Sequence, residues 1–145
     1  MNKEHYQKLE NMYLAAPINK FYNPTITVKE CTAEITIAVK KDFFHAANAV
    51  HGSVCFKMLD DAAFFAVNSI VEDVFVLTGT FETNFLRPIT AGEIVAKGMV
   101  VSNWGNKFEA ESELFNAEGK RVAAGEGTFI KSKILLASID SFKIQ

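Results

Sequence analysis

The sequence has little proline or glycine and no excess of one charge. Three prolines and eight glycines stand among 145 residues, of which 49% are apolar and 22% are charged. This composition is that of an ordinary globular protein rather than of a disordered chain. Seventeen acidic residues balance fifteen basic ones, for a formal net charge of -2, and no basic cluster could follow a phosphate backbone. We therefore expect one domain over residues 1–145 and no nucleic-acid partner.

Long apolar runs are also missing. The longest stretches without a charged side chain, residues 43–56 and 62–71, are shorter than the roughly 18 to 20 residues of a membrane span. The first residues, MNKEHYQKLE, alternate charges and lack the apolar core of a signal peptide. The sequence therefore predicts a cytoplasmic protein without a membrane span.

Common catalytic and metal-binding motifs are absent. There is no GxSxG, HExxH, Walker or GxGxxG motif, which argues against familiar serine hydrolases, zinc proteases and nucleotide-binding folds. Cys31 and Cys55 lack a CxxC spacing and stand among apolar residues, as buried thiols do. His45, His51 and Asp60 are conceivable metal ligands, but no pair of them has the i, i+4 spacing of zinc motifs. We expect neither a metal nor a cofactor.

Hydrophobic periodicity predicts a helix, two strands, a second helix and four further strands. Apolar residues recur at helical spacing over residues 3–14 and alternate with polar ones over residues 25–39, with a turn near residues 31–33. Residues 52–69 are apolar on nearly all sides, which is typical of a buried helix. The later strands are expected at residues 74–86, 93–104, 107–116 and 121–131.

Turn signals separate these later strands. Trp104-Gly105-Asn106 and residues 116–119 are typical of hairpins, so we expect the four strands to be neighbours in an antiparallel meander. The tail, residues 134–145, should be frayed or packed on a partner. An antiparallel sheet of about six strands that wraps around the apolar helix would bury both sides of that helix, which makes the fold α+β. Open sheet edges favour pairing with a second copy, so we expect at least a dimer.

The charges within the apolar helix are the best candidates for chemistry. Moving a carboxylate out of water costs on the order of several kcal/mol unless it is paired, so Asp60 and Asp61 require an explanation. Lys57 lies three and four residues before them, and the three could form a solvated stripe with a weak ion pair. Alternatively, Asp60 lies in a cleft at a dimer seam and acts as general base or nucleophile.

Two histidines and an amide side chain precede this helix, in the segment HAANAVHGS at 45–53. The first amides of a helix carry partial positive charge and have no intrahelical acceptor. Such amides at the start of the helix could therefore stabilise a developing oxyanion, and Gly52 would allow a substrate carbonyl to approach closely. His45 and His51 could instead serve only for capping or packing.

Four segments resemble motifs of one known family. They are VHGSV at 50–54, LDDAAF at 59–64, FLRPI at 85–89 and AGE at 91–93. They are similar to the PaaI-like (phenylacetic-acid-degradation) branch of the hotdog-fold acyl-CoA thioesterases, in the 4-hydroxybenzoyl-CoA thioesterase superfamily. In that branch a His-Gly-Gly motif opens the central helix, an Asp follows nine residues after the His, and an FLRP-like segment follows on the next strand. The similarity extends from about residue 25 to residue 131.

The resemblance implies a hotdog fold, in which the sheet wraps a long central helix and two protomers join their sheets. Each active site then lies between one subunit's helix and the partner's strands. Asp60 becomes the catalytic carboxylate, and the Gly52 amide polarises the thioester carbonyl. Thr78, eighteen residues after Asp60, matches a hydroxyl residue that helps to orient the attacking water.

Two residues depart from the family pattern. Ser53 replaces the second Gly of the motif, and His45 stands where an Asn is common, with Asn48 nearby. Either His45 or Asn48 could bond the carbonyl or the water, and Arg87 is a possible contact for the phosphates of coenzyme A. We therefore expect catalytic roles for Asp60, Gly52, His51, Thr78 and His45, and substrate contacts from Asn48, Ser53, Asp61 and Arg87.

The leading hypothesis is hydrolysis of an acyl-CoA thioester to free acid and CoA by a homodimer or homotetramer. The thirteen phenylalanines include several that could line an acyl pocket. Two alternatives stay open. A hotdog hydratase or dehydratase would need His45 or His51 to face Asp60, and a non-catalytic acyl-CoA-binding hotdog protein would bind the substrate without turnover.

Overall fold

The structure, a computed structural model, describes residues 2–145. Three α-helices and six strands follow one another in the order α1 (Lys3–Ala15), α2 (Asn19–Tyr22), β1 (Thr25–Lys29), β2 (Thr32–Ala38), α3 (Gly52–Asn68), β3 (Val74–Phe85), β4 (Glu93–Trp104), β5 (Lys107–Phe115) and β6 (Arg121–Leu135). Two short 3₁₀ helices, Lys41–Phe43 and Leu136–Ser138, precede α3 and follow β6. All the predicted helices and strands are present within a few residues of their expected ends. The short helix α2 was not predicted.

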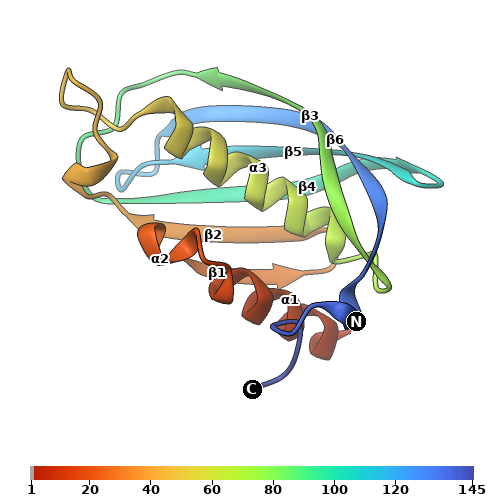
Figure 1. The fold of residues 1–145 in the computed structure, drawn as a ribbon. Coiled ribbons are helices and arrows are strands. Elements are labelled where there is room, and N and C mark those ends of the chain that lie inside the picture. Colours follow the sequence, from red (N-terminus) through yellow and green to blue (C-terminus); the bar gives the residue numbers. More distant parts are fainter. Residues whose placement is uncertain (1) are drawn as a thin grey trace.

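The central helix α3 lies against one face of the curved sheet (Figure 1). Its Ala62, Ala63 and Ala66 side chains are fully buried, and their small size brings the helix close to the strands. At Gly98 of β4 a Cβ atom would overlap the carbonyl group of Ala62. The apolar character of residues 52–69 therefore reflects burial against the sheet. The expectation that both sides of the helix are buried holds only for this side, because Ser53 and Phe56 on the other side are exposed.

The six strands form one antiparallel sheet in the order β1-β2-β4-β5-β6-β3. The expected meander holds for β4, β5 and β6, but the prediction that β3 neighbours β4 is wrong. β3 pairs with β6, where Gly125 and Gly127 make room for the ring of Phe81: a Cβ at either glycine would overlap that ring. Among residues 2–145 no strand pairs with the other edge of β3.

The N-terminal helix and the C-terminal tail lie together at the opposite edge, beside β1 (Figure 1). Asn11 Nδ2 of α1 donates to the Lys143 carbonyl at 2.8 Å, and the rings of His5 and Phe142 meet edge to face at 5.7 Å. The expectation that the tail is frayed or packed on a partner is therefore wrong, because it packs on α1 of its own chain. β6 also extends to Leu135, four residues beyond its predicted end.

The two cysteines are free thiols. Cys55 is buried in α3, while Cys31 is only half-buried, in the β1–β2 turn with a left-handed backbone (φ 63°). In the described part of the chain, no helix combines the length and the apolar character that a membrane span requires.

Candidate active site

Asp60 lies on the face of α3 that is turned toward β3. Its Oδ1 accepts a hydrogen bond of 2.9 Å from Thr78 Oγ1. Ser53, Lys57 and Phe64 occupy the same face, because residues three, four or seven positions apart in a helix share one side. These side chains line one cavity together with Asp60. Of the predicted site residues, the structure thus brings together Asp60, Asp61, Thr78 and Ser53 around this cavity.

The strand β3 is irregular directly after Thr78. The pairing of β3 with β6 shifts register between Thr78 and Thr80, so Gly79 is an extra residue in the strand. In a regular strand, residues three apart face opposite sides. The bulge lets Phe81 also face α3, where its ring packs against that of Phe56 at 5.6 Å.

The cavity beside Asp60 has a volume of about 600 Å³. One wall is the exposed face of α3, a second is β3 with Phe75 and Leu77, and a third comes from α1, α2 and the residues between them. The lining includes six aromatic side chains, among them Tyr22, Phe56 and Phe64. Such a mostly apolar cavity with few polar groups is typical of a site for an organic ligand.

Burial raises the pKa of Asp60 from its ordinary value of 3.8 to about 6. The hydrogen bond from Thr78 opposes this effect, because it favours the ionised carboxylate, and the positive charge of Lys57 does the same. The neighbouring charge of Asp61 adds to the rise. A carboxylate with a pKa near 6 is ionised at neutral pH and still basic enough to accept a proton from water.

Asp61 forms the predicted ion pair with Lys57, but the pair is largely buried and not part of a solvated surface. Lys57 Nζ lies 2.6 Å from Asp61 Oδ2, and the two side chains are only 12% and 20% exposed. The hydroxyl of Tyr13 in α1 donates to the same oxygen at 2.7 Å. Burial, followed by the charge of Asp61, raises the pKa of Tyr13, so this hydroxyl stays protonated.

His51 caps the start of α3. Its Nδ1 accepts from the Ser53 N–H at 3.0 Å and lies 2.8 Å from Ser53 Oγ. The departure at Ser53 thus has a local effect, since the hydroxyl joins the capping imidazole. Gly52 is the first residue of the helix, so its N–H has no intrahelical acceptor.

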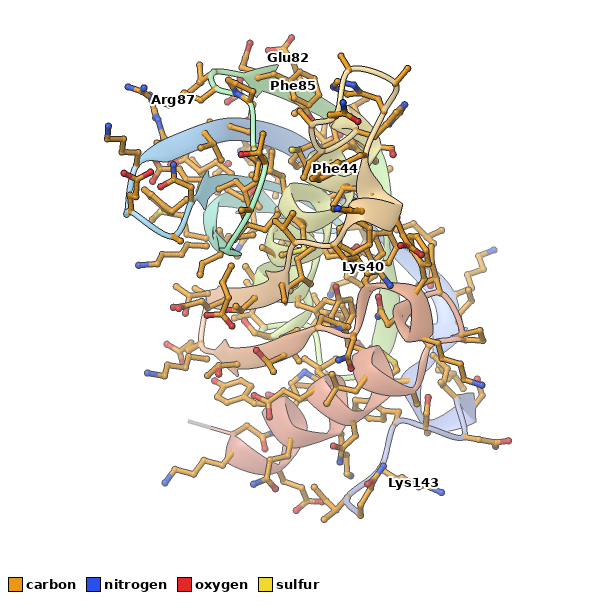
Figure 2. All side chains as sticks on the ribbon, turned by 90° about the vertical axis from the view of Figure 1, so that its left-hand side faces the viewer. Lys40, Phe44, Glu82, Phe85, Arg87 and Lys143 are labelled. Atoms are coloured by element: carbon orange, nitrogen blue, oxygen red, sulfur yellow. The ribbon has the colours of Figure 1, made fainter. Side chains whose placement is uncertain are left out.

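A second cavity, of about 370 Å³, lies on the other side of the first turn of α3. It is lined by His45, Gly52, Phe85 and Arg87, among others. The Phe85 ring lies against Gly52, where a Cβ would come within 3.2 Å of it. Figure 2 shows Phe85 beside the loop that leads into α3, and Arg87 directed away from the molecule at its margin.

The remaining candidates lie near this second cavity. His45 is exposed on the loop before α3, where its Nδ1 accepts from the Ala47 N–H at 3.0 Å. Asn48 is exposed in the same loop with a φ of 65°. Cys55 also lines the cavity, but burial raises its pKa to about 11, so it is a protonated thiol. Within residues 2–145, no group of three His, Cys, Asp or Glu side chains is placed to hold a metal ion.

Comparisons with known proteins concern the family and the fold of the chain. Residues 47–123 match the family model of the Thioesterase superfamily, and this segment is more than half of the chain. A curated protein of Archaeoglobus fulgidus, provisionally named an esterase, is 31% identical over 105 residues. That match covers 71% of this chain and 66% of the relative's length.

Solved structures share the fold at low sequence identity. The Escherichia coli PaaI protein from the phenylacetic acid degradation operon has a TM-score of 0.81 at 22% identity, over 92% of this chain and 99% of PaaI. A thioesterase from Haemophilus influenzae has a TM-score of 0.75 at 18% identity, over 83% of this chain and 85% of that one. The predicted hotdog fold is confirmed. By its match over residues 47–123, the chain belongs to the Thioesterase superfamily.

Proposed function

We propose that the protein hydrolyses an acyl-CoA thioester to a free acid and CoA. The main support is the half-buried carboxylate of Asp60, whose pKa is raised to about 6 and which accepts from Thr78 at the wall of a large aromatic cavity. Membership of the Thioesterase superfamily supports the reaction class. The aromatic cavity suits the acyl group, because its lining is mostly apolar.

The reaction needs an attacking oxygen and a stabilised carbonyl oxygen. In one route Asp60 removes a proton from water, whose oxygen attacks the thioester carbon. The Gly52 N–H stabilises the oxyanion, the C–S bond breaks, and the thiolate of CoA takes up the proton. In the other route the Asp60 carboxylate attacks first, the C–S bond breaks, and the CoA thiolate leaves behind a mixed anhydride. Water then hydrolyses the anhydride to the free acid and the Asp60 carboxylate, and the thiolate takes up the proton released. Thr78 would orient Asp60 in both.

Gly52 and Asp60 are too far apart to meet one carbonyl group within a single chain. They are eight residues apart on α3, which corresponds to about 12 Å along the helix axis. We therefore place each active site between the Gly52 of one chain and the Asp60 of a second, in a homodimer. The unpaired edge of β3, which carries Thr78, offers a surface for joining the two sheets. A homotetramer would arise if two such dimers pair.

The second cavity would then hold the arm of CoA. It adjoins Gly52, and the exposed Arg87 at its margin could contact a phosphate. His45, which lines this cavity, and Asn48, in the same loop, are the candidates for bonding a carbonyl oxygen or a water there. The reaction requires no cofactor.

Thiol release from a panel of acyl-CoAs of varied length and ring content tests this proposal. We expect turnover of at least one member, and binding without thiol release would support the non-catalytic alternative. The hydratase alternative needs a histidine facing Asp60. Neither His45 nor His51 of the same chain lines the cavity of Asp60, so such a histidine would have to come from the second chain. Incubation with an enoyl thioester, followed by absorbance of its conjugated bond, is expected to show no hydration.

The hydrogen bond from Thr78 gives a prediction about pH. Asp60 must be ionised to act, so activity should rise with pH through the region of its pKa, about 6. The Thr78→Val variant loses a bond that lowers this pKa, so the midpoint should move upward by about one pH unit. Activity should therefore fall more at pH 6 than at pH 8. The measurement is the pH profile of kcat/KM.

Thr80→Val is the matched control for this variant. Thr80 lies on the same strand, but its hydroxyl bonds to Thr128 at 2.8 Å and not to Asp60. Its profile should equal that of the wild type. Equal midpoints in both variants would show that Thr78 does not control the ionisation of Asp60.

A further inference from the structure

The wall of the large cavity that faces away from β3 is built by the N-terminal segment. It consists of Met12, Tyr13, Ala16, Ile18, Asn19 and Tyr22. These residues come from α1, α2 and the residues between them, all of which precede the segment that matches the superfamily, residues 47–123. The cavity thus joins a catalytic wall shared with the superfamily to a wall that the family match does not include.

A polar cluster fixes this N-terminal wall to α3. The ammonium group of Lys57 donates to Asp61 Oδ2 at 2.6 Å, to Asn19 Oδ1 at 2.7 Å and to the Tyr13 hydroxyl at 3.3 Å. It also lies 4.6 Å from the ring centre of Tyr22. An ammonium group has three N–H donors, so each of them has an acceptor here. Lys57 therefore has no donor left for a substrate, and its role is to hold the wall.

The cluster also ties α1 to α2. Asn19 Nδ2 donates to the Tyr13 carbonyl at 2.7 Å, close to the end of α1, and Tyr13 donates to Asp61 at 2.7 Å. Because these groups are largely buried, loss of one partner leaves another without a hydrogen bond, which is costly. These hydrogen bonds therefore fix the distance between the N-terminal wall and Asp60 on α3.

We infer that this N-terminal wall, held by the Lys57–Asp61 pair, sets the largest acyl group that the site accepts. The inference rests on the proposed function, since the acyl group is placed in this cavity. An acyl group whose carbonyl lies near α3 extends across the cavity until its tip meets the N-terminal wall. The wall therefore limits the length of the acyl group. Lys57 and Asp61 are positioning residues in this scheme and do not touch the reacting atoms.

Two neighbouring alanines offer a matched test. Ala16 is half-buried and lines the cavity, whereas Ala15 is exposed on the same turn of α1. Each is changed to Leu in a chain that also carries Asp60→Asn, so that acyl-CoAs bind without turnover. Dissociation constants for butyryl-, octanoyl- and palmitoyl-CoA are then measured by calorimetry.

We expect Ala16→Leu to weaken binding of the longer acyl-CoAs about tenfold relative to butyryl-CoA. The reason is that the Leu side chain fills part of the cavity that a long acyl chain would occupy. Ala15→Leu should leave all three constants unchanged. A profile for Ala16→Leu that coincides with that of Ala15→Leu would overturn the inference. Ile18→Ala, which removes an exposed side chain from the same wall, should improve binding of the longest acyl group. That variant decides the matter if Ala16→Leu does not fold.

The role of the polar cluster is tested by Lys57→Met, again together with Asp60→Asn. Loss of the three hydrogen bonds should loosen the wall and reduce the difference in affinity between octanoyl- and palmitoyl-CoA. Tyr13→Phe, which removes one hydroxyl, should act in the same direction but less. Unchanged differences in both variants would contradict the positioning role. Because these are binding measurements, they stand even if wild-type protein fails to release thiol, which would overturn the proposed function alone.

Discussion

Replacement of Asp60 with Asn is expected to lower kcat for thioester hydrolysis by about 10²- to 10⁴-fold. The amide keeps the size of the carboxylate and can still bond to Thr78 Oγ1, which lies 2.9 Å away. It can neither accept a proton from water nor attack the thioester carbon, so both routes stop. The measurement is thiol release at saturating acyl-CoA. Activity near that of the wild type would contradict the assignment of Asp60.

Asp61→Asn is the matched control, because it makes the same change one residue later. Its carboxylate is already bonded to Lys57 and Tyr13, so we expect a loss of stability of about 1 to 3 kcal/mol and less than about a tenfold loss of kcat. A loss as large as that of Asp60→Asn would show that the two carboxylates act as a unit.

Thermal unfolding separates loss of catalysis from loss of fold in Asp60→Asn. The pKa of Asp60 is raised from 3.8 to about 6 by burial, so the folded chain binds this proton more tightly than the unfolded chain. The free energy of unfolding therefore falls as pH rises between these two values, and it stays lower above them. Asn carries no charge to bury. The variant should unfold at the same temperature as the wild type or higher at pH 8.

The helices and strands could be predicted because their patterns are local. The apolar composition of residues 52–69 reflects burial of the sheet-facing side of α3 (Gly52–Asn68), and the hairpin signals place β4, β5 and β6 correctly. The position of β3 could not be read from such patterns, because strand pairing depends on contacts far apart in sequence. A signal was nevertheless present, since Gly125 and Gly127 leave room for an aromatic ring, and that ring is Phe81.

The candidate site divides in the same way. The proximity of Asp60 and Thr78 could be anticipated, because Asp60 is a charge in an apolar helix and the family resemblance points to Thr78. Their catalytic roles, and that of Gly52, stay predictions. The pairing of Lys57 with Asp61 was expected, but the other two partners of Lys57, Tyr13 and Asn19, were missed. Tyr13 fits the apolar periodicity of α1 as any core residue would, and nothing nearby in sequence links it to Asp61, 48 residues away. The burial of the pair is likewise a product of tertiary packing.

The inactive variants Gly52→Val and Asp60→Asn are expected to regain activity when they are combined in one dimer, if the site is shared between chains. Gly52→Val places a branched side chain against Phe85, whose ring lies 3.2 Å from the Cβ position, and so blocks the carbonyl site. Asp60→Asn removes the base. In a mixed dimer, one site combines the intact Gly52 of the Asp60→Asn chain with the intact Asp60 of the Gly52→Val chain. Co-expressed at equal levels, the variants should yield about a quarter of wild-type activity.

A second mixture gives the opposite test with the same substitutions. The double variant, Gly52→Val with Asp60→Asn, is co-expressed with the wild-type chain. If each site takes Gly52 from one chain and Asp60 from the other, every mixed dimer is inactive, and about a quarter of the activity remains. If Gly52 and Asp60 act within one chain, each wild-type chain keeps its own site, about half of the activity remains, and the first mixture stays inactive. A shared site thus predicts about a quarter of the activity in both mixtures, whereas an intrachain site predicts none in the first mixture and about half in the second. The intrachain outcome would require a carbonyl group to be reached from two points eight residues apart on α3, about 12 Å along its axis.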